Sequence, residues 1–211
     1  VLVEPIQGEA GVKVPGAGYL QQLRAICDEQ GWLLIVDEIQ SGLCRSGKWY
    51  AHQHENIQPD VLTTAKALAN GLPIGACVAS GKAAEALTPG RHGSTFGGNP
   101  LVSRVGCTVL DIMQSEDLAG RAAEMGGMIL DGLAQRLGDD PRVRDIRGRG
   151  LMIGIELDRD VNHVKQQALE AGVLLNVTQD RVIRLLPPLI IDASQAEQIT
   201  DTVCTLIASM E

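Results

Sequence analysis

The sequence predicts an α/β fold, in which a mostly parallel sheet is followed by a smaller α+β domain. Up to about residue 113, short apolar runs alternate with stretches of helical periodicity, which is typical of strands joined by helices. The runs are too short and too continuously apolar for half-exposed strands, so they indicate a sheet buried on both faces. After residue 114 the strands are less regularly separated by helices. We therefore divide the chain into domains 1–113 and 114–211.

The first domain is expected to contain strands at 1–4, 33–36, 61–64 and 74–79. Between the first two strands, apolar residues from Leu20 to Cys27 recur at helical spacing, and Gly31 provides a left-handed stop. A second helix begins after Asn99 as its N-cap, with Pro100 in the first turn.

The second domain opens with a helix over 115–137 that stops at Gly138. Strands are expected at 151–157, 173–177 and 182–186, and a further helix at 162–171. The segment 148–150, Gly-Arg-Gly, is interpreted as a turn. The last helix, 194–210, opens with Ser194, whose spacing to Glu197 matches a capping box.

Composition excludes several classes of protein. The 211 residues carry 18 basic and 26 acidic side chains, a net charge of −8, which argues against broad binding to nucleic acid or an anionic membrane. Aromatic residues make up 2% of the chain, so a stacking platform for single strands is not expected. Five cysteines without a Cys-x-x-Cys pair are typical of reduced thiols. We expect a soluble, cytoplasmic protein that spans no membrane.

Carboxylates and one lysine follow predicted strands at the edge where α/β sheets bind ligands. Glu4 follows the first strand, and Asp37 and Glu38 follow the second. Asp37 emerges from a buried strand, so we expect it to have a cationic partner. The alternative is that Asp37 does no more than cap a turn. Lys66 follows the third strand among small and apolar neighbours. Desolvation there would favour the neutral amine that a Schiff-base lysine needs, and the alternative is a lysine whose stem covers apolar surface.

A glycine- and hydroxyl-rich loop, 91–100, leads into the helix that begins at Pro100. Such a loop can present N–H and hydroxyl groups to a phosphate, although its spacing matches neither a Walker loop nor a dinucleotide fingerprint. His52 and His54 have metal-like spacing, but no third ligand is recognisable nearby, so we interpret them as surface histidines and predict no metal site. A strand-end acid, a lysine and a phosphate loop are together the parts that pyridoxal phosphate requires.

Four segments, 4–11, 37–42, 66–68 and 92–100, closely resemble the class III aminotransferases in sequence and order. The resemblance covers the whole chain. It implies a pyridoxal-phosphate transferase of fold type I, with 1–113 as the C-terminal part of the large cofactor-binding domain and 114–211 as the small C-terminal domain. Enzymes of this family carry a further N-terminal portion before the first of these motifs, so the large domain would be incomplete here.

The resemblance also implies the cofactor contacts. Lys66 would be the catalytic lysine that carries pyridoxal 5'-phosphate and moves a proton during the reaction. Asp37 would pair with the pyridine nitrogen, and Gln40 would reach the phenolic oxygen of the ring. Glu38 and Ile39 would complete the segment along the cofactor.

Further residues would bind phosphate and substrate. By the resemblance, Thr95 binds the phosphate of the neighbouring subunit's cofactor in a homodimer, and Ser94 lies near the substrate. Glu9 would pair with Arg184 when an amino donor is bound and release it to clamp a carboxylate of 2-oxoglutarate. Without the resemblance, a structural salt bridge is the simpler interpretation of that pair.

The implied reaction moves the terminal amino group of N-acetylornithine to 2-oxoglutarate, a step of arginine biosynthesis. Ornithine, succinylornithine and 4-aminobutyrate stay open as donors, although Glu9 favours the ornithine-like group. Because the chain opens on strand residue Val1, we expect it to begin inside the fold, the alternative being a trimmed amino terminus. Because the N-terminal portion that the family carries is missing, we expect this chain by itself to bind the cofactor poorly and to transaminate little. The alternative is a non-catalytic remnant or partner subunit, against which the retention of Lys66, Asp37, Gln40 and Thr95 argues.

Overall fold

The computed structural model describes residues 1–210 and divides into two compact units. The first unit contains Val1–Ile6, Pro15–Cys44 and Lys48–Asp117. The second contains the chain from Leu118 onward together with two short segments from earlier in the sequence, Gln7–Val14 and Arg45–Gly47. Each unit is described separately below.

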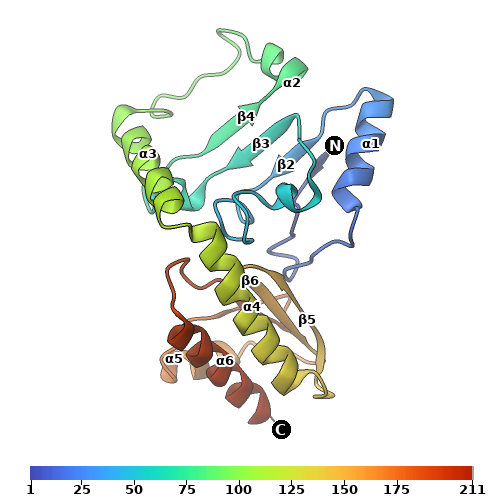
Figure 1. Cartoon of the computed structure of the whole chain (residues 1–211), viewed down its shortest axis with the longest axis vertical. Coiled ribbons are helices and arrows are strands. Elements are labelled where there is room, and N and C mark those ends of the chain that lie inside the picture. Colours follow the sequence, from blue (N-terminus) through green and yellow to red (C-terminus); the bar gives the residue numbers. More distant parts are fainter. Residues whose placement is uncertain (211) are drawn as a thin grey trace. The chain divides into compact units, whose positions relative to one another are not determined.

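The first unit is built on a four-stranded sheet in the order β1-β2-β3-β4 (Figure 1). The strands are β1 (Leu2–Val3), β2 (Ile35–Asp37), β3 (Val61–Thr64) and β4 (Ala76–Ala79). β1, β2 and β3 run parallel, and β4 joins β3 in the antiparallel sense. The predicted mostly parallel sheet is therefore confirmed, and the carboxyl ends of β2 and β3 meet at one edge.

Helix α1 (Tyr19–Gln30) connects β1 to β2 and ends at Gly31, whose φ of 66° confirms the predicted left-handed stop. Its first turn has no side-chain cap of its own. The Glu55 carboxylate takes that role, because it accepts the N–H groups of Leu20 (2.9 Å) and Gln21 (3.2 Å).

The other helical segments of the first unit are η1 (Ala51–Glu55), η2 (Lys66–Ala69), α2 (Gly81–Ala86) and α3 (Pro100–Ser115). Helix α3 confirms the expected start, since the Asn99 side chain accepts the N–H of Val102 at 3.2 Å. Helix α3 packs against η2, which begins at Lys66. The apolar centre of this unit includes Cys27, Leu34 and Val36.

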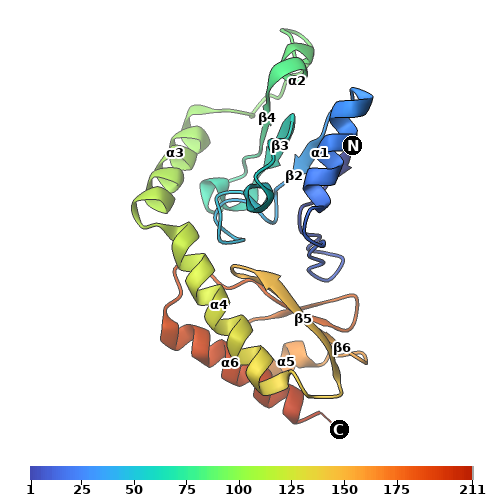
Figure 2. The same cartoon turned by 45° about the vertical axis from the view of Figure 1, so that its right-hand side comes forward.

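The second unit has an antiparallel sheet in the order β5-β6-β8-β7, partly covered by helices. Figures 1 and 2 show α4 and α6 side by side, and α4 also packs on β5. The elements are α4 (Leu118–Leu137), β5 (Val143–Arg149), β6 (Met152–Leu157), α5 (Val164–Glu170), β7 (Asn176–Thr178), β8 (Val182–Leu185) and α6 (Ala193–Ala208).

Sequence periodicity missed β5, which pairs along its length with β6. Its apolar residues are interrupted by arginines and an aspartate, so neither the helical period of 3.6 residues nor the strand period of 2 dominates. The segment 148–150 was interpreted as a turn, but Gly148 and Arg149 belong to β5, and only Gly150 lies in the hairpin turn, with a φ of 53°. The prediction for 148–150 was thus largely wrong.

Two helix starts differ from the predictions. Helix α4 begins at Leu118, not at residue 115, because Asp117 adopts a left-handed φ of 44° and separates it from α3. Helix α6 is capped by Asp192, whose carboxylate accepts the N–H of Gln195 at 2.8 Å while the Gln195 amide accepts the Asp192 N–H. Ser194 is therefore inside the helix, and the capping box begins two residues earlier than predicted.

The described cysteines are all free thiols, and Cys27, Cys44 and Cys204 are buried. Burial raises the pKa of the Cys44 thiol to about 11, so this group stays protonated and unreactive at neutral pH. Within residues 1–210, the helices are all too short or too polar to cross a lipid bilayer.

Close backbone contact joins α4 to the β5–β6 hairpin and to the segment Arg45–Gly47. A Cβ on Gly126 would lie 2.7 Å from the Gly150 Cα, and a Cβ on Gly150 would lie 2.5 Å from the Gly47 nitrogen. The guanidinium of the half-buried Arg45 donates to the carbonyls of Leu151 (3.0 Å) and Pro187 (2.5 Å). Backbone groups in this region approach too closely for any side chain at Gly126.

We predict that Gly126→Ala lowers the free energy of unfolding by about 3 kcal/mol, because the added methyl group must displace the Gly150 backbone. Gly127→Ala is the matched control, since a Cβ on Gly127 meets nothing within 4 Å. The control should raise stability by up to about 1 kcal/mol through helix propensity. Urea unfolding of both variants checks this, and equal effects at the two positions would contradict the packing described here.

Candidate functional site

Asp37 and Lys66 lie at one edge of the first unit's sheet. Asp37 ends β2 and is in register with Thr63 of the parallel strand β3. Lys66 follows β3 directly and opens η2. Since parallel strands present their carboxyl ends at the same edge, this edge is where a ligand of an α/β sheet is expected.

The Asp37 carboxylate is half-buried and only partly engaged. Its Oδ1 accepts the N–H of Ile39 at 3.0 Å. No cationic side chain pairs with it within residues 1–210, so the cationic partner expected from the sequence is not supplied by the described chain. The carboxylate is therefore available to a cationic group of a ligand.

Lys66 is exposed, which corrects the expectation of a desolvated lysine. Among its small and apolar neighbours, Leu68 and Ala69 are buried and Ala65 is half-buried, so burial of the neighbours does not extend to the lysine. The residue also has a left-handed φ of 49°. That conformation costs about 1 to 2 kcal/mol for a residue with a side chain, and such strain gathers at functional sites.

Glu38 turns in the opposite direction from Asp37 and is 1% exposed. Its carboxylate accepts the Ser41 hydroxyl (2.6 Å) and the N–H groups of Ala51 (2.9 Å) and His52 (2.8 Å), and it lies 3.0 Å from His52 Nδ1. A carboxylate with this many internal partners has no capacity left for a ligand. The Glu38 side chain thus holds segment 38–52 together, and the expected place of Glu38 along the cofactor stays a prediction.

His52 was also misjudged from the sequence. It is buried and stacks on Tyr50 with ring centroids 5.9 Å apart, so it is not a surface histidine. His54 is half-buried. Within residues 1–210, His, Cys, Asp and Glu side chains form no cluster suited to a metal ion.

Ile39 and Gln40 follow Asp37 in a tight turn, in which the Gly42 N–H donates to the Glu38 carbonyl at 2.9 Å. Both residues are half-buried. A Cβ on Gly42 would lie 2.8 Å from that carbonyl oxygen, so the turn requires glycine there. The turn therefore keeps residues 39 and 40 next to the strand end that carries Asp37.

Ser94 and Thr95 lie in an exposed loop that leads into α3. The Ser94 hydroxyl accepts the N–H of Gly97 at 3.0 Å, and the Asn99 amide donates to the Phe96 carbonyl at 2.8 Å. These contacts shape the end of the loop and leave Thr95 in an exposed position. The loop can thus offer a hydroxyl to a ligand from outside this unit.

Glu9 and Arg184 form an ion pair in the second unit. Arg184 Nη1 donates to Glu9 Oε1 at 2.8 Å. The arginine side chain, on β8, is 8% exposed, whereas the glutamate side chain is 69% exposed. Arg184 Nε is buried and has no hydrogen-bond partner among the described residues. The arginine is therefore the fixed partner and the glutamate the one that can move, although the buried guanidinium then needs another anion to replace the glutamate.

The structure brings the predicted residues together in two groups. Glu9 and Arg184 are in direct contact. Asp37 and Lys66 share a sheet edge, but within residues 1–210 no hydrogen bond or ion pair connects them to each other or to Thr95. Sequence reasoning placed His52 on the surface, and it missed Arg147, whose guanidinium donates to the carbonyls of Gly11 and Val12. For Arg147, the alternation of Asp145, Ile146 and Arg147 along β5 was the available signal.

Comparisons with known proteins identify the family. A family model for class III aminotransferases matches residues 1–207, and the chain belongs to this family. Acetylornithine aminotransferase 1 of Bordetella pertussis is 50% identical over 207 residues, which cover 98% of this chain and 53% of that protein. Ornithine aminotransferase 1 of Staphylococcus aureus is 45% identical over 200 residues, 94% of this chain and 50% of that protein.

A solved structure agrees with this family. The ornithine aminotransferase of Toxoplasma gondii, described with partial occupancy of pyridoxal phosphate at its active site, superposes with a TM-score of 0.94 at 41% identity. The match covers 99% of this chain and 50% of that one. The chain thus spans about half the length of its relatives. The predicted fold, that of the fold type I transferases that use pyridoxal phosphate, is confirmed.

Class III aminotransferases depend on pyridoxal phosphate, and the residues present fit this group. The free oxygen of Asp37 can meet a protonated ring nitrogen, because no cation of the described chain occupies it. The Lys66 amine is accessible. Thr95 and its loop offer an exposed hydroxyl to a phosphate.

We predict that substitutions of the two adjacent acidic residues differ strongly in their effect on stability. Glu38→Ala should lower the free energy of unfolding by about 3 to 5 kcal/mol, because it leaves several buried donors unpaired. Asp37→Asn should change it by less than about 1 kcal/mol, because the remaining amide oxygen still accepts the Ile39 N–H.

Urea unfolding without cofactor measures both effects, and cofactor titration of Asp37→Asn provides the complementary readout. Asp37→Asn should weaken cofactor binding although it spares the fold. A large loss of stability in Asp37→Asn, or a stable Glu38→Ala protein, would reverse the assignment of these two side chains.

Proposed function

We propose that this chain provides the lysine-bearing sheet edge and the carboxylate-selecting pair of a pyridoxal-phosphate aminotransferase. The proposed reaction moves the terminal amino group of N-acetylornithine to 2-oxoglutarate and yields glutamate, a step of arginine biosynthesis. The observation that carries this proposal is the ion pair between Glu9 and Arg184, with Nη1 and Oε1 2.8 Å apart.

The pair suits a reaction with two different substrates in one site. While the exposed Glu9 covers it, Arg184 is neutralised and tolerates the reacting end of the amino donor, whose terminal carbon carries an amino group and no carboxylate. When Glu9 turns to water, the buried guanidinium can bind a carboxylate of 2-oxoglutarate with two parallel hydrogen bonds. The unpaired Nε of Arg184 supplies a further donor for that carboxylate.

The sheet edge would provide the remaining functions. Bound pyridoxal phosphate supplies an electron sink for the substrate carbon. We assign Lys66 Nζ to attaching the cofactor and to moving a proton, and Asp37 to keeping the ring nitrogen protonated. Gln40 would donate to the phenolic oxygen of the ring, with Ile39 alongside, and Ser94 would lie near the substrate.

A second copy of the chain is the proposed partner. Thr95 lies in an exposed loop of its own unit, which supports a role at the cofactor phosphate of a neighbouring subunit in a homodimer. The free thiols of the described chain support a reducing compartment, and we propose the cytoplasm.

The proposed donor rests on two observations. The relative named acetylornithine aminotransferase is 50% identical to this chain, and the one named ornithine aminotransferase is 45% identical. Glu9, paired with Arg184, favours ornithine-like donors over 4-aminobutyrate. N-Acetylornithine is therefore ranked ahead of ornithine and succinylornithine.

The first test compares these donors. Because the chain spans about half the length of its relatives, the assay uses the protein expressed from the complete reading frame of its gene. With 2-oxoglutarate as acceptor, glutamate formation should give the highest kcat/KM for N-acetylornithine. A higher value for another donor would change the substrate assignment, and no turnover with any donor would favour the non-catalytic alternative.

The second test separates the half-reactions. Arg184→Ala should slow the 2-oxoglutarate half-reaction by about 100-fold, because a buried carboxylate loses charged hydrogen bonds, while the donor half-reaction changes little. Arg181→Ala, at an exposed position just before the same strand, is the control and should leave both halves unchanged.

Single-turnover measurements of each half-reaction decide the outcome. Arg184→Lys keeps a positive charge and serves as a second variant in case the alanine substitution unfolds the strand. Equal losses in the two half-reactions would indicate that the ion pair only stabilises the fold.

A further inference from the structure

The two arginines Arg147 and Arg184 occupy one row across the second unit's sheet. Arg147 on β5 is in register with Gly154 on β6, and Gly154 is in register with Arg184 on β8. Directly paired residues of antiparallel strands place their side chains on the same face. The two guanidinium groups therefore flank a glycine, which leaves open space between them.

The segment that carries Glu9 fills this space. A Cβ on Gly154 would lie 3.1 Å from Val12 Cβ and 3.3 Å from the Gly11 carbonyl oxygen. Val12 is fully buried. The loop between Gln7 and Lys13 is thus packed on the sheet between the two arginines, and Glu9 extends from it to Arg184.

The loop has a strained backbone that cannot pair with the sheet. Gln7 and Lys13 exchange two hydrogen bonds of 3.0 Å, and the N–H groups of Gly11 and Val12 both donate to the Gly8 carbonyl. Gly11 has a φ of 95° and Val12 a φ of 52°, a conformation that β-branched residues rarely adopt. An external contact must hold such a turn in place.

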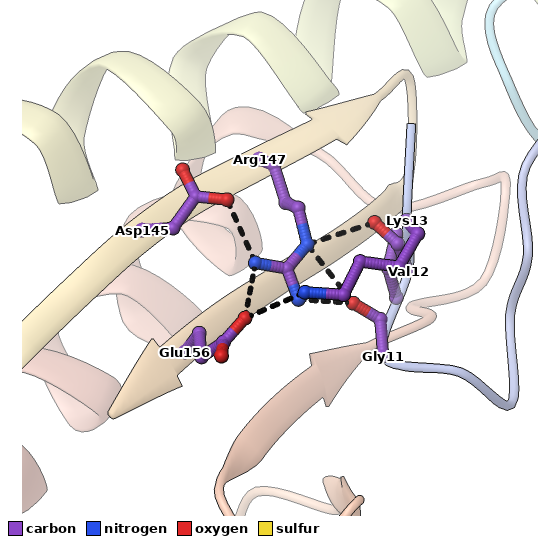
Figure 3. A network of polar contacts seen from close by, with 6 residues as sticks. All are labelled: Gly11, Val12, Lys13, Asp145, Arg147 and Glu156. Carbon is purple, nitrogen blue, oxygen red and sulfur yellow. Dashed lines mark hydrogen bonds and ion pairs between the residues drawn. The ribbon is translucent and has the colours of Figure 1, made fainter. Parts of the chain in front are cut away.

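Arg147 supplies that contact, as Figure 3 shows. Its Nε donates to the carbonyls of Gly11 and Val12, each at 3.0 Å, and its Nη2 donates to Gly11 at 2.5 Å. Its Nη1 is held by Asp145 at 2.7 Å and Glu156 at 2.8 Å. The side chain is 10% exposed, so these bonds are shielded from water.

The same carboxylate holds the end of the loop. Lys13 Nζ donates to Glu156 Oε2 at 2.8 Å. The Lys13 ammonium holds the pKa of Glu156 below its usual range against partial burial, and the Arg147 guanidinium adds to this effect. Glu156 therefore stays ionised at neutral pH and links Arg147 to the loop at a second point.

We propose that Arg147 is a positioning residue for the pair formed by Glu9 and Arg184. It fixes the loop backbone, so that Glu9 covers or uncovers Arg184 by turning its side chain and not by moving the loop. The Glu9 carbonyl is held in addition by Gln179 Nε2 at 3.0 Å, whereas the Glu9 side chain is 69% exposed. This inference rests on the proposed function, because it assigns a role in substrate selection.

Arg147→Lys tests the proposal. Lysine keeps the positive charge between Asp145 and Glu156 but cannot reach both loop carbonyls with a planar group. A loosened loop would cover Arg184 less well, so kcat/KM for the donor half-reaction should fall by about tenfold relative to the 2-oxoglutarate half-reaction. Glu9→Gln should shift the ratio in the same direction, and the double variant should show no further shift.

Arg149→Lys, on the same strand two residues further on, is the matched control and should leave the ratio unchanged. Asp145→Asn loosens Arg147 from its exposed partner and should cause a smaller shift in the same direction, which keeps the test informative if Arg147→Lys unfolds. Equal losses in both half-reactions, or additive effects with Glu9→Gln, would overturn the positioning role.

Hydrogen exchange in the holoenzyme, without substrates, separates this proposal from the proposed function. The N–H groups of Gly11 and Val12 should exchange faster in Arg147→Lys than in the wild type, while those of α4 should not. Unchanged exchange would overturn the proposal whatever the activity. Absence of turnover in the wild type would overturn the proposed function alone, and faster exchange would then still support the role of Arg147 in holding the loop.

Discussion

The second unit depends on the hydrogen bonds between the largely buried guanidinium of Arg147 and main-chain carbonyls of the loop that carries Glu9. The turn at Gly11 and Val12 has left-handed backbone angles, so its carbonyls cannot join a sheet ladder. Arg147 cannot lose its proton and must find acceptors when it is buried. The guanidinium donates to these carbonyls, so that both the donor and the acceptors are satisfied. As a result, the loop that carries Glu9 is held on the sheet. Gly154 favours this contact, because a Cβ there would lie only 3.1 Å from the Val12 Cβ and would push the loop outward.

In the first unit, strand alternation gives two adjacent acids opposite tasks. Asp37 ends β2, and the next residue points to the other side of the chain, as successive residues of extended backbone do. Glu38 is therefore directed inward, where backbone N–H groups, Ser41 and His52 satisfy it. Asp37 keeps an oxygen free at the sheet edge. The internal acid holds the turn that supports the external one, which links the stability of this segment to its proposed chemistry.

The two arginines of the second unit show how burial separates fixed from movable charges. Arg184 and Arg147 are both largely buried, and their positions are set by the strands that carry them. Of their acidic partners, Glu9 and Asp145 are mostly exposed, whereas Glu156, the second partner of Arg147, is largely buried. An exposed carboxylate is already largely hydrated when it moves, and the buried guanidinium that it leaves needs a replacement anion, whereas moving the guanidinium itself would also leave a cavity. In the pair formed by Glu9 and Arg184, the partner expected to move is therefore Glu9, because its side chain is already in contact with water.

The amino-acid sequence by itself determined the elements whose signals are local. The parallel strands, the stop at Gly31, the Asn99 cap and the placement of Asp37 and Lys66 at strand ends all follow from short-range patterns. Tertiary structure decided what depends on partners distant in sequence. The burial of Glu38 against His52, the exposure of Lys66, the strand β5 and the contact of Arg147 with Gly11 were not predicted. The sequence does not distinguish a charged side chain that is solvated from one that is paired. The difference depends on partners that only the folded chain brings into contact.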